Sequence, residues 1–100
     1  MPAWLNLAQA YQDAGLYNEA MIQYETLNKM VTHNKGYIYY GIAGLYSQQK
    51  KYEECEAYLE SSLKDDFNVL EYLKSDIRFK YFRKTPAYRA FLENHDMKIP

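Results

Sequence analysis

Residues that could carry chemistry are scarce in this sequence. Among its 100 residues there are one cysteine and two histidines. Cys55 has no second cysteine to pair with, and no general base can be placed beside it. His33 falls in a polar turn and His95 in a polar tail, and neither has a Cys, Asp or Glu at metal-ligand spacing. We therefore expect no catalytic residue, no metal site and no cofactor, and predict that the chain is not an enzyme.

Long apolar runs are also missing. No run approaches the ~20 apolar residues that a membrane-spanning helix needs, and the N-terminus lacks the charged and apolar regions of a signal peptide. A helical pattern starts almost at once, with Trp4. The sequence therefore predicts either a cytoplasmic chain with no membrane partner or a piece of a longer protein.

An excess of charge of one sign is absent as well. The 12 Lys and Arg residues nearly cancel the 13 Asp and Glu residues, and the net charge is −1. This balance argues against generic binding to nucleic acid or to an anionic membrane.

The charges are nevertheless unevenly spread. Acidic residues gather at Glu53, Glu54, Glu56, Glu60, Asp65 and Asp66, and basic residues follow at Lys74, Arg78, Lys80, Arg83, Lys84 and Arg89. Basic residues among aromatics can bind single-stranded nucleic acid, but here the aromatics have the spacing of a packed helix. We expect solvated faces, or pairing of the two charged segments, rather than nucleic-acid binding.

What the sequence does contain is an internal repeat with a period of 35 residues. The identical pairs are Ala8 and Ala43, Tyr11 and Tyr46, Tyr17 and Tyr52, Glu19 and Glu54, Glu25 and Glu60, and Lys29 and Lys64. A fixed period of this length, built from two helical segments, is typical of stacked helical hairpins. Such scaffolds bind other molecules more often than they transform them.

Apolar periodicity predicts two helices in each copy. The expected ranges are residues 3–14, 19–31, 37–49 and 53–64. Gly15 is expected to cap the end of the first helix, and Asn18 the start of the second. The small residues Ala8, Ala20 and Ala43 would let paired helices approach closely.

Two glycines and the cysteine have a packing explanation. Gly41 and Gly44 lie inside the third expected helix, where each costs ~1 kcal/mol relative to alanine. This cost predicts close approach by a neighbouring helix or a ligand. Cys55 stands in the place that Ala20 has in the first copy, so we expect it to be a small buried packing residue.

The first copy resembles the tetratricopeptide repeat, and residues 37–66 resemble a second copy. The resemblance lies in the pattern Trp4-x-x-Leu7-Ala8-x-x-Tyr11, followed by Ala20-x-x-x-Tyr24. It implies an all-α fold, a right-handed α–α superhelix of helical hairpins. One domain over residues 1–100 is expected, with repeat one at about 2–34 and repeat two at about 37–66.

The period fails after the second copy, where Lys74 and Arg78 replace the apolar residues that a third copy would need. Residues 73–92 instead resemble the terminal motif that often closes tetratricopeptide arrays, although Ile77 stands where the family usually has proline. This implies a capping helix pair at about 67–94, with Asp76 and Thr85 as N-caps and Pro86 at a first helical position. Its side chains Phe79, Phe82, Tyr88 and Leu92 are expected to be largely buried and to shield Leu59 and Leu63.

The family resemblance also implies where a partner would bind. In the family, the first helices of successive repeats line a concave groove that holds a peptide or a partner's helix. The residues expected to line it are Leu5, Gln9, Gln12, Asp13, Tyr37, Tyr40, Gly44, Ser47 and Gln48. The family's clamp for a terminal carboxylate is missing, because Leu5, Gln9 and Gly41 stand at its positions. We predict a protein-interaction or scaffold module that catalyses no reaction.

Two alternatives stay open at this point. The chain could be the C-terminal appendage of a larger enzyme or signalling protein whose catalytic domain lies outside these residues. It could also be a self-associating module, since roughly three repeats are normally needed for stability. The first hairpin would then form a symmetric homodimer through its outer surface, with Leu16, Met21 and Ile22 as exposed apolar residues.

Overall fold

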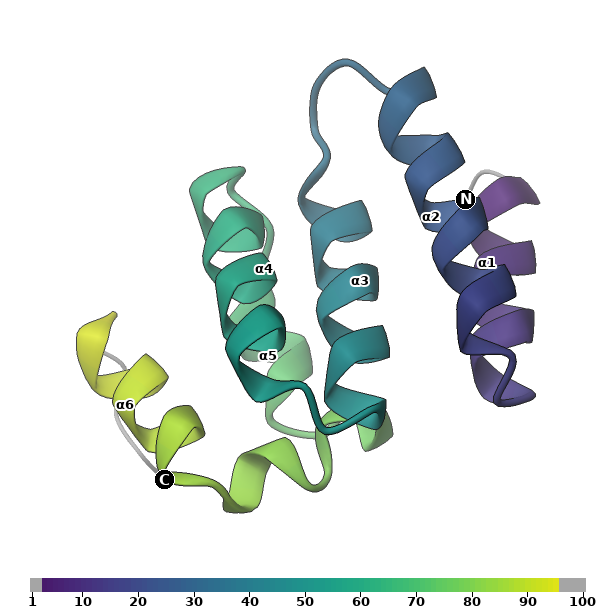
Figure 1. The fold of residues 1–100 in the computed structure, drawn as a ribbon. Helices are drawn as coiled ribbons and strands as arrows, with labels where there is room; N and C mark the ends of the chain where they lie inside the picture. The colour runs from purple at the N-terminus through teal and green to yellow at the C-terminus, as the bar shows by residue number, and fades with distance from the viewer. Residues whose placement is uncertain (1–2, 96–100) are drawn as a thin grey trace.

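The chain folds into two antiparallel helical hairpins followed by a segment of shorter helices (Figure 1). The structure, a computed structural model, describes the backbone of residues 3–95 and the side chains of residues 6–95. The side chains of Trp4 and Leu5 therefore lie outside the described residues. The first hairpin is α1 (Ala3–Asp13) and α2 (Tyr17–Met30), and the second is α3 (Gly36–Gln48) and α4 (Tyr52–Lys64). No strand occurs between residues 3 and 95, and the all-α prediction is confirmed.

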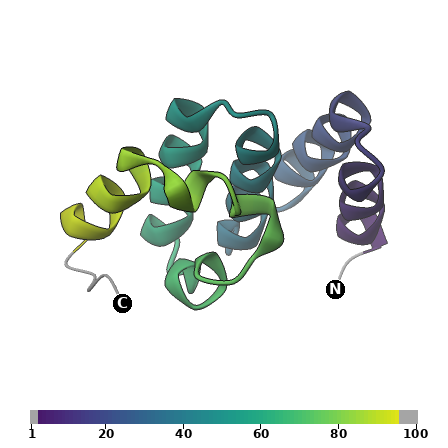
Figure 2. The same cartoon turned by 90° about the horizontal axis from the view of Figure 1, so that it is seen from below.

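The closing segment, residues 67–95, contains four short elements. They are α5 (Val69–Leu73), the 3₁₀ turns η1 (Ile77–Phe79) and η2 (Phe82–Lys84), and α6 (Pro86–Asn94). In both views this segment lies along the α3–α4 hairpin, and α6 ends up far from α1 (Figures 1 and 2). Figure 2 shows the chain between α5 and α6 crossing this hairpin.

The two hairpins turn in the same way, one period apart. Gly15 has a φ of +80°, and the Leu16 N–H donates to the Tyr11 carbonyl oxygen at 2.9 Å. In the second hairpin Lys50 has a φ of +62°, and the Lys51 N–H donates to the Tyr46 carbonyl oxygen at 2.9 Å. The predicted cap at Gly15 is confirmed. A lysine at the equivalent place costs about 1 kcal/mol of backbone strain.

Two details of the predicted helices were wrong. Asn18 is not the N-cap of α2, because the tight turn at Gly15 starts the helix at Tyr17 and leaves Leu16 in the cap position without a side-chain bond. The helix expected after Asp76 is replaced by η1 and η2, and α5 precedes them. With only five residues, α5 is too short for apolar periodicity to reveal it. The N-caps Asp76 and Thr85 are confirmed: each accepts a hydrogen bond from the backbone N–H two or three residues later.

Helix α3 is central to the fold and is buried on nearly all sides. One face, with Ile38, Ile42 and Leu45, packs against Ala8, Ala20, Tyr24 and Leu27 of the first hairpin. The opposite side, with Tyr40 and Ala43, packs against α4 and the closing segment. The two hairpins and the closing segment are therefore held together through one helix.

The closing segment covers the second hairpin as the sequence predicts. Phe79, Phe82 and Leu92 are buried, and they share one apolar cluster with Leu59. Tyr88 and Leu63 keep part of their surface exposed, but both pack against this cluster, and Tyr88 is largely buried as predicted. The ring of Tyr88 packs edge-on against Phe82, with its centroid at 5.8 Å, and so leaves part of its surface to water.

Close approach explains both glycines inside α3. A Cβ atom at Gly41 would lie 2.5 Å from Cε1 of Tyr24, and one at Gly44 would lie 3.3 Å from Cδ of Arg78. Cys55 is fully buried in the core beside α3, as predicted for a packing residue. Burial raises the pKa of the Cys55 thiol to about 12, and the nearby Glu56 carboxylate adds to this effect.

Candidate protein-binding groove

The concave side of α3 carries the closing segment. The Tyr40 hydroxyl donates to Oδ2 of Asp76 at 2.8 Å, and Oγ of Ser47 donates to the Arg78 carbonyl oxygen at 2.9 Å. The Arg78 side chain passes over Gly44, where no Cβ obstructs it. The residues that begin η1 therefore occupy the face of α3 that the sequence assigned to a partner.

Asp76 and Arg78 form a shielded ion pair at this contact. Nη2 of Arg78 lies 2.6 Å from Oδ2 of Asp76, and Nε lies 3.0 Å from Oδ1. The two side chains are 14% and 17% exposed. The Arg78 guanidinium also lies over the ring of Tyr40, 5.3 Å from its centroid. A charged pair removed from water in this way needs such additional partners to offset the loss of hydration.

These contacts shift the acidity of the groups involved. Burial alone would raise the pKa of Asp76, but the hydrogen bonds and charge of Arg78 outweigh it and hold that pKa below its ordinary value. Burial would lower the pKa of Arg78, and Asp76 raises it instead. Burial and the neighbouring Asp76 carboxylate both raise the pKa of Tyr40. At neutral pH, the pair is thus charged and the tyrosine is a neutral hydrogen-bond donor.

A second polar chain links α1 and α3 beneath the same contact. The Tyr24 hydroxyl donates to Oε1 of Gln12 at 2.7 Å, and Nε2 of Gln12 donates to Oε1 of Gln48 at 2.6 Å. Burial raises the pKa of Tyr24 to about 12. Gln12 is therefore a buried link between the two repeats.

Four of the nine predicted groove residues are consequently withdrawn from solvent. Gln12, Tyr40, Gly44 and Ser47 are buried. Their placement on a face free of packing was wrong, because the closing segment and the Gln12–Gln48 bond cover that face. Of the others, Asp13 is exposed, Gln9, Tyr37 and Gln48 are half-buried, and the side chain of Leu5 is outside the described residues. Whether the groove binds a partner stays a prediction.

What remains of the groove is a hollow of about 210 Å³ between α1 and η1, here called the α1–η1 hollow. It is lined by Gln9, Gln12, Asp13, Asp76, Ile77 and Arg78. Ile77 is 75% exposed and stands at its rim, an apolar side chain in water. Sequence reasoning found Gln9, Gln12 and Asp13 but missed the contribution of η1, since only the folded chain brings residue 77 next to α1.

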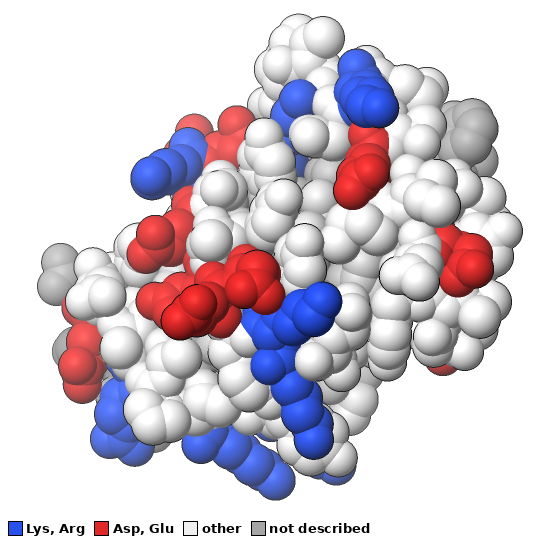
Figure 3. Space-filling model, viewed as in Figure 1, with Lys and Arg blue, Asp and Glu red and all other residues white. Residues whose placement is uncertain are grey.

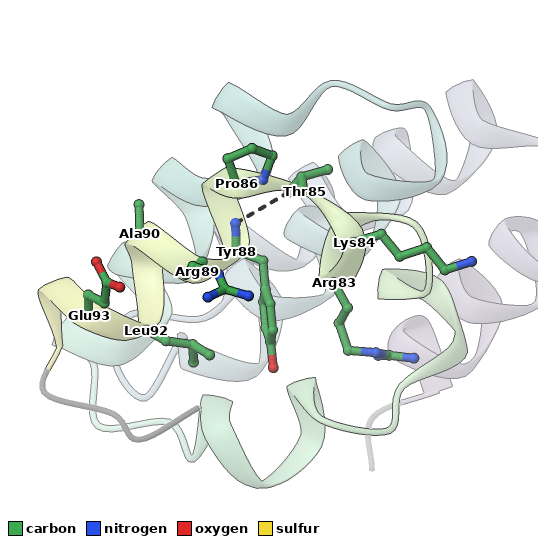
Figure 4. Close-up of a pocket in the computed structure, with 9 residues that line it drawn as sticks. All are labelled: Arg83, Lys84, Thr85, Pro86, Tyr88, Arg89, Ala90, Leu92 and Glu93. Carbon is green, nitrogen blue, oxygen red and sulfur yellow. Dashed lines mark hydrogen bonds between the residues drawn. The ribbon is translucent and has the colours of Figure 1, made fainter. Parts of the chain in front are cut away.

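A larger hollow than this one lies against η2 and α6 (Figure 4). It measures about 690 Å³ and is lined by Arg83, Lys84, Thr85, Pro86, Tyr88, Arg89, Ala90, Leu92 and Glu93. Arg83 stabilises the closing segment, because its Nη1 donates to the carbonyl oxygens of Leu73 at 2.9 Å and Asp76 at 2.7 Å. Figure 4 shows the Tyr88 ring and Leu92 side by side along α6, facing this hollow. Of the lining residues, Leu92 is buried in the core and Tyr88 packs against it.

The described residues offer little for chemistry or membrane insertion. Between residues 3 and 95, no cluster of three or more His, Cys, Asp or Glu side chains is suited to hold a metal ion. Across the same residues, every helix is too short or too polar to span a bilayer.

Comparison with known families agrees with the geometry of the two hairpins. The sequence profile of the tetratricopeptide repeat matches residues 2–30 and 36–65, one match for each hairpin. The chain belongs to the tetratricopeptide repeat family. Repeats of this family generally mediate protein–protein interaction. No curated protein and no solved structure matches the chain.

The second match ends at residue 65, directly after α4. The closing segment lies beyond this match, and its role comes from the structure. It covers the apolar side of α4 with its aromatic residues and the concave side of α3 with η1.

Proposed function

We propose that this tetratricopeptide chain is a protein-interaction module that binds a polypeptide segment in the α1–η1 hollow and catalyses no reaction. The observation that carries the proposal is the exposed Ile77 beside a concave surface of repeat one. A large apolar side chain beside a hollow is a contact that a partner can bury, since the centre of an interface is its most apolar part.

The side chains that line the hollow suggest which side chains a bound peptide segment would carry. Asp13 is exposed and Gln9 is half-exposed on the α1 side, while Ile77 is apolar on the η1 side. A bound segment would place an apolar side chain against Ile77 and direct amide or cationic donors to the Asp13 carboxylate. The Asp76–Arg78 pair is satisfied internally and would form the floor of the hollow.

The test starts from peptides selected on the native chain from a random display library. Affinities are then measured by fluorescence anisotropy for the native chain, for the double variant Gln9→Arg/Ile77→Asp, and for the control Tyr72→Asp. Tyr72 is also exposed and lies in the closing segment, but it is not part of the hollow. The double variant should bind about tenfold more weakly or worse, and the control within about twofold of the native chain. An equal loss of affinity in the control would contradict the proposal. So would a peptide that shifts the amide NMR signals of the outer faces of α2 and α4 instead of those of the hollow.

Self-association is a second candidate, favoured by the outer surface of the first hairpin. Leu7 and Ile42 are equivalent positions of the two repeats. Ile42 is 3% exposed because the first hairpin covers Ile42, whereas Leu7 is 39% exposed. Leu16 and Ile22 are exposed on the same hairpin as predicted, whereas Met21 is half-buried. Stacked repeats normally cover such a face.

The expected result is a symmetric dimer in sedimentation at ~100 μM, far above the dissociation constants of standard-sized interfaces. The double variant Leu7→Lys/Ile22→Lys should sediment as a monomer, and Tyr72→Lys should remain a dimer. A native chain that is monomeric at this concentration removes the dimer and leaves the α1–η1 hollow as the proposed interaction surface.

A further inference from the structure

A group of three lysines surrounds one exposed tyrosine on the closing segment. The Nζ atoms of Lys50, Lys80 and Lys84 lie 5.6, 5.7 and 5.9 Å from the centroid of the Tyr81 ring. Tyr81 is 55% exposed, and the three lysines are exposed as well. Lys50 comes from the turn between α3 and α4, whereas the others flank Tyr81 in sequence. These four residues are here called the lysine–tyrosine patch.

Among the described residues, none of the three lysines forms an ion pair with a carboxylate. The ion pairs among the described residues are Arg78 with Asp76 and His95 with Glu60, and neither involves these lysines. A ring in reach of one ammonium gains about 0.5–1 kcal/mol from cation–π attraction at an exposed site. Three ammonium groups around one ring also repel one another, and an anion placed between them would relieve that repulsion.

The backbone at Lys50 points in the same direction. Lys50 has a φ of +62° and occupies the turn position that Gly15 fills in the first hairpin. Glycine adopts such a φ without strain, although Asn34 and Asp66 adopt it as well among the described residues. The side chain does reach the Tyr81 ring, and the strained residue is thus one of the three that create the patch.

The neighbouring charges limit the size of an anionic partner. Glu53 and Glu54, both exposed, follow Lys50 within four residues at the start of α4. Figure 3 shows acidic side chains over α4 directly beside the basic ones at the α3–α4 turn. A nucleic-acid strand or a bilayer would extend over these carboxylates and be repelled, whereas a short peptide can contact the lysines alone.

We infer that the lysine–tyrosine patch binds an acidic peptide segment of a partner protein. Carboxylates of the segment contact Lys50, Lys80 and Lys84, and an apolar part of the segment covers the Tyr81 ring. This site is separate from the α1–η1 hollow, and it does not depend on the function proposed for that hollow.

The test measures the affinity of the full chain for three labelled probes by fluorescence anisotropy or co-sedimentation. The probes are an oligo-glutamate peptide with one leucine, a single-stranded oligonucleotide of equal charge, and vesicles that contain phosphatidylserine. The triple variant Lys50→Gln/Lys80→Gln/Lys84→Gln is compared with Lys29→Gln/Lys64→Gln/Lys74→Gln. Both change the net charge equally, and all six lysines are exposed, so both variants should fold.

The expected result is tightest binding of the acidic peptide, with NMR shifts at Tyr81. The patch variant should weaken this binding about tenfold, and the control variant less than about twofold. If the control variant weakened peptide binding equally, the loss of affinity would come from the overall charge, and the proposed site would be wrong. Absence of peptide binding, or tighter binding of the oligonucleotide or the vesicles, would overturn the acidic-peptide assignment. A hollow variant, Gln9→Arg/Ile77→Asp, should bind the acidic peptide as the native chain does.

Discussion

A chain ended after Ser75 should fail to fold or should aggregate. The truncation removes Phe79, Phe82, Phe91 and Leu92, all of them buried in the cluster that contains Leu59. Each large side chain of this kind contributes about 2–5 kcal/mol when fully buried, and a domain of this size has about 5–15 kcal/mol in total. The loss therefore exceeds the stability available. Circular dichroism during urea unfolding would show a low helical content and no cooperative transition.

A graded version of this experiment keeps the chain at full length. Phe82→Ala should lower the free energy of unfolding by about 3–5 kcal/mol, while Tyr81→Ala, at an exposed neighbouring site, should change it by less than about 0.5 kcal/mol. A soluble truncated protein that melts cooperatively would show that the two hairpins do not need the closing segment.

Replacing Arg78 by methionine should cost about 2–4 kcal/mol of stability. The change leaves the Asp76 carboxylate, which is 14% exposed, with no cation to offset its burial. It also removes the guanidinium that lies over Tyr40. Arg89→Met is the matched control, because Arg89 is exposed on α6; it should stay within about 0.5 kcal/mol of the native chain. Equal effects of the two variants in urea unfolding would mean that the ion pair contributes nothing.

The same pair predicts a pH dependence with a definite sign. The pKa of Asp76 is lower in the folded chain than its ordinary value, which is about 3.9. Its contribution to stability is therefore fully present above about pH 4 and is lost as the pH falls through the lowered folded-state pKa. Asp76→Asn should remove this part of the acid dependence. An unchanged slope of stability against pH below about pH 4 would contradict the assignment.

The hairpins could be predicted from sequence because their determinants are local and repeated. Ala8 and Ala43 recur at the same register, and each buried apolar face follows the helical period. The docking of the closing segment could not be predicted in the same way. Asp76 and Arg78 are charged, and a charged residue in isolation indicates exposure to solvent. Only the fold shows that they satisfy each other over Tyr40.

The burial of four predicted groove residues could not be predicted for the same reason. Tyr40 and Ser47 are buried in α3 under the closing segment, and neither residue by itself indicates a cover in the sequence. Gly44 was the usable signal. Its cost inside a helix predicted close approach, and the group that approaches is the Arg78 side chain from the closing segment.

The closing segment occupies the concave side of α3 and leaves the α1–η1 hollow as the open part of the groove. The most direct measurement is the set of nuclear Overhauser contacts of the Tyr40 ring in the native chain. Its centroid lies 5.2 Å from that of Phe79 and 5.3 Å from that of Phe67. We therefore expect cross-peaks to both rings and a slowly exchanging Tyr40 hydroxyl proton. A Tyr40 ring without these cross-peaks, and open to a soluble paramagnetic probe, would contradict the account.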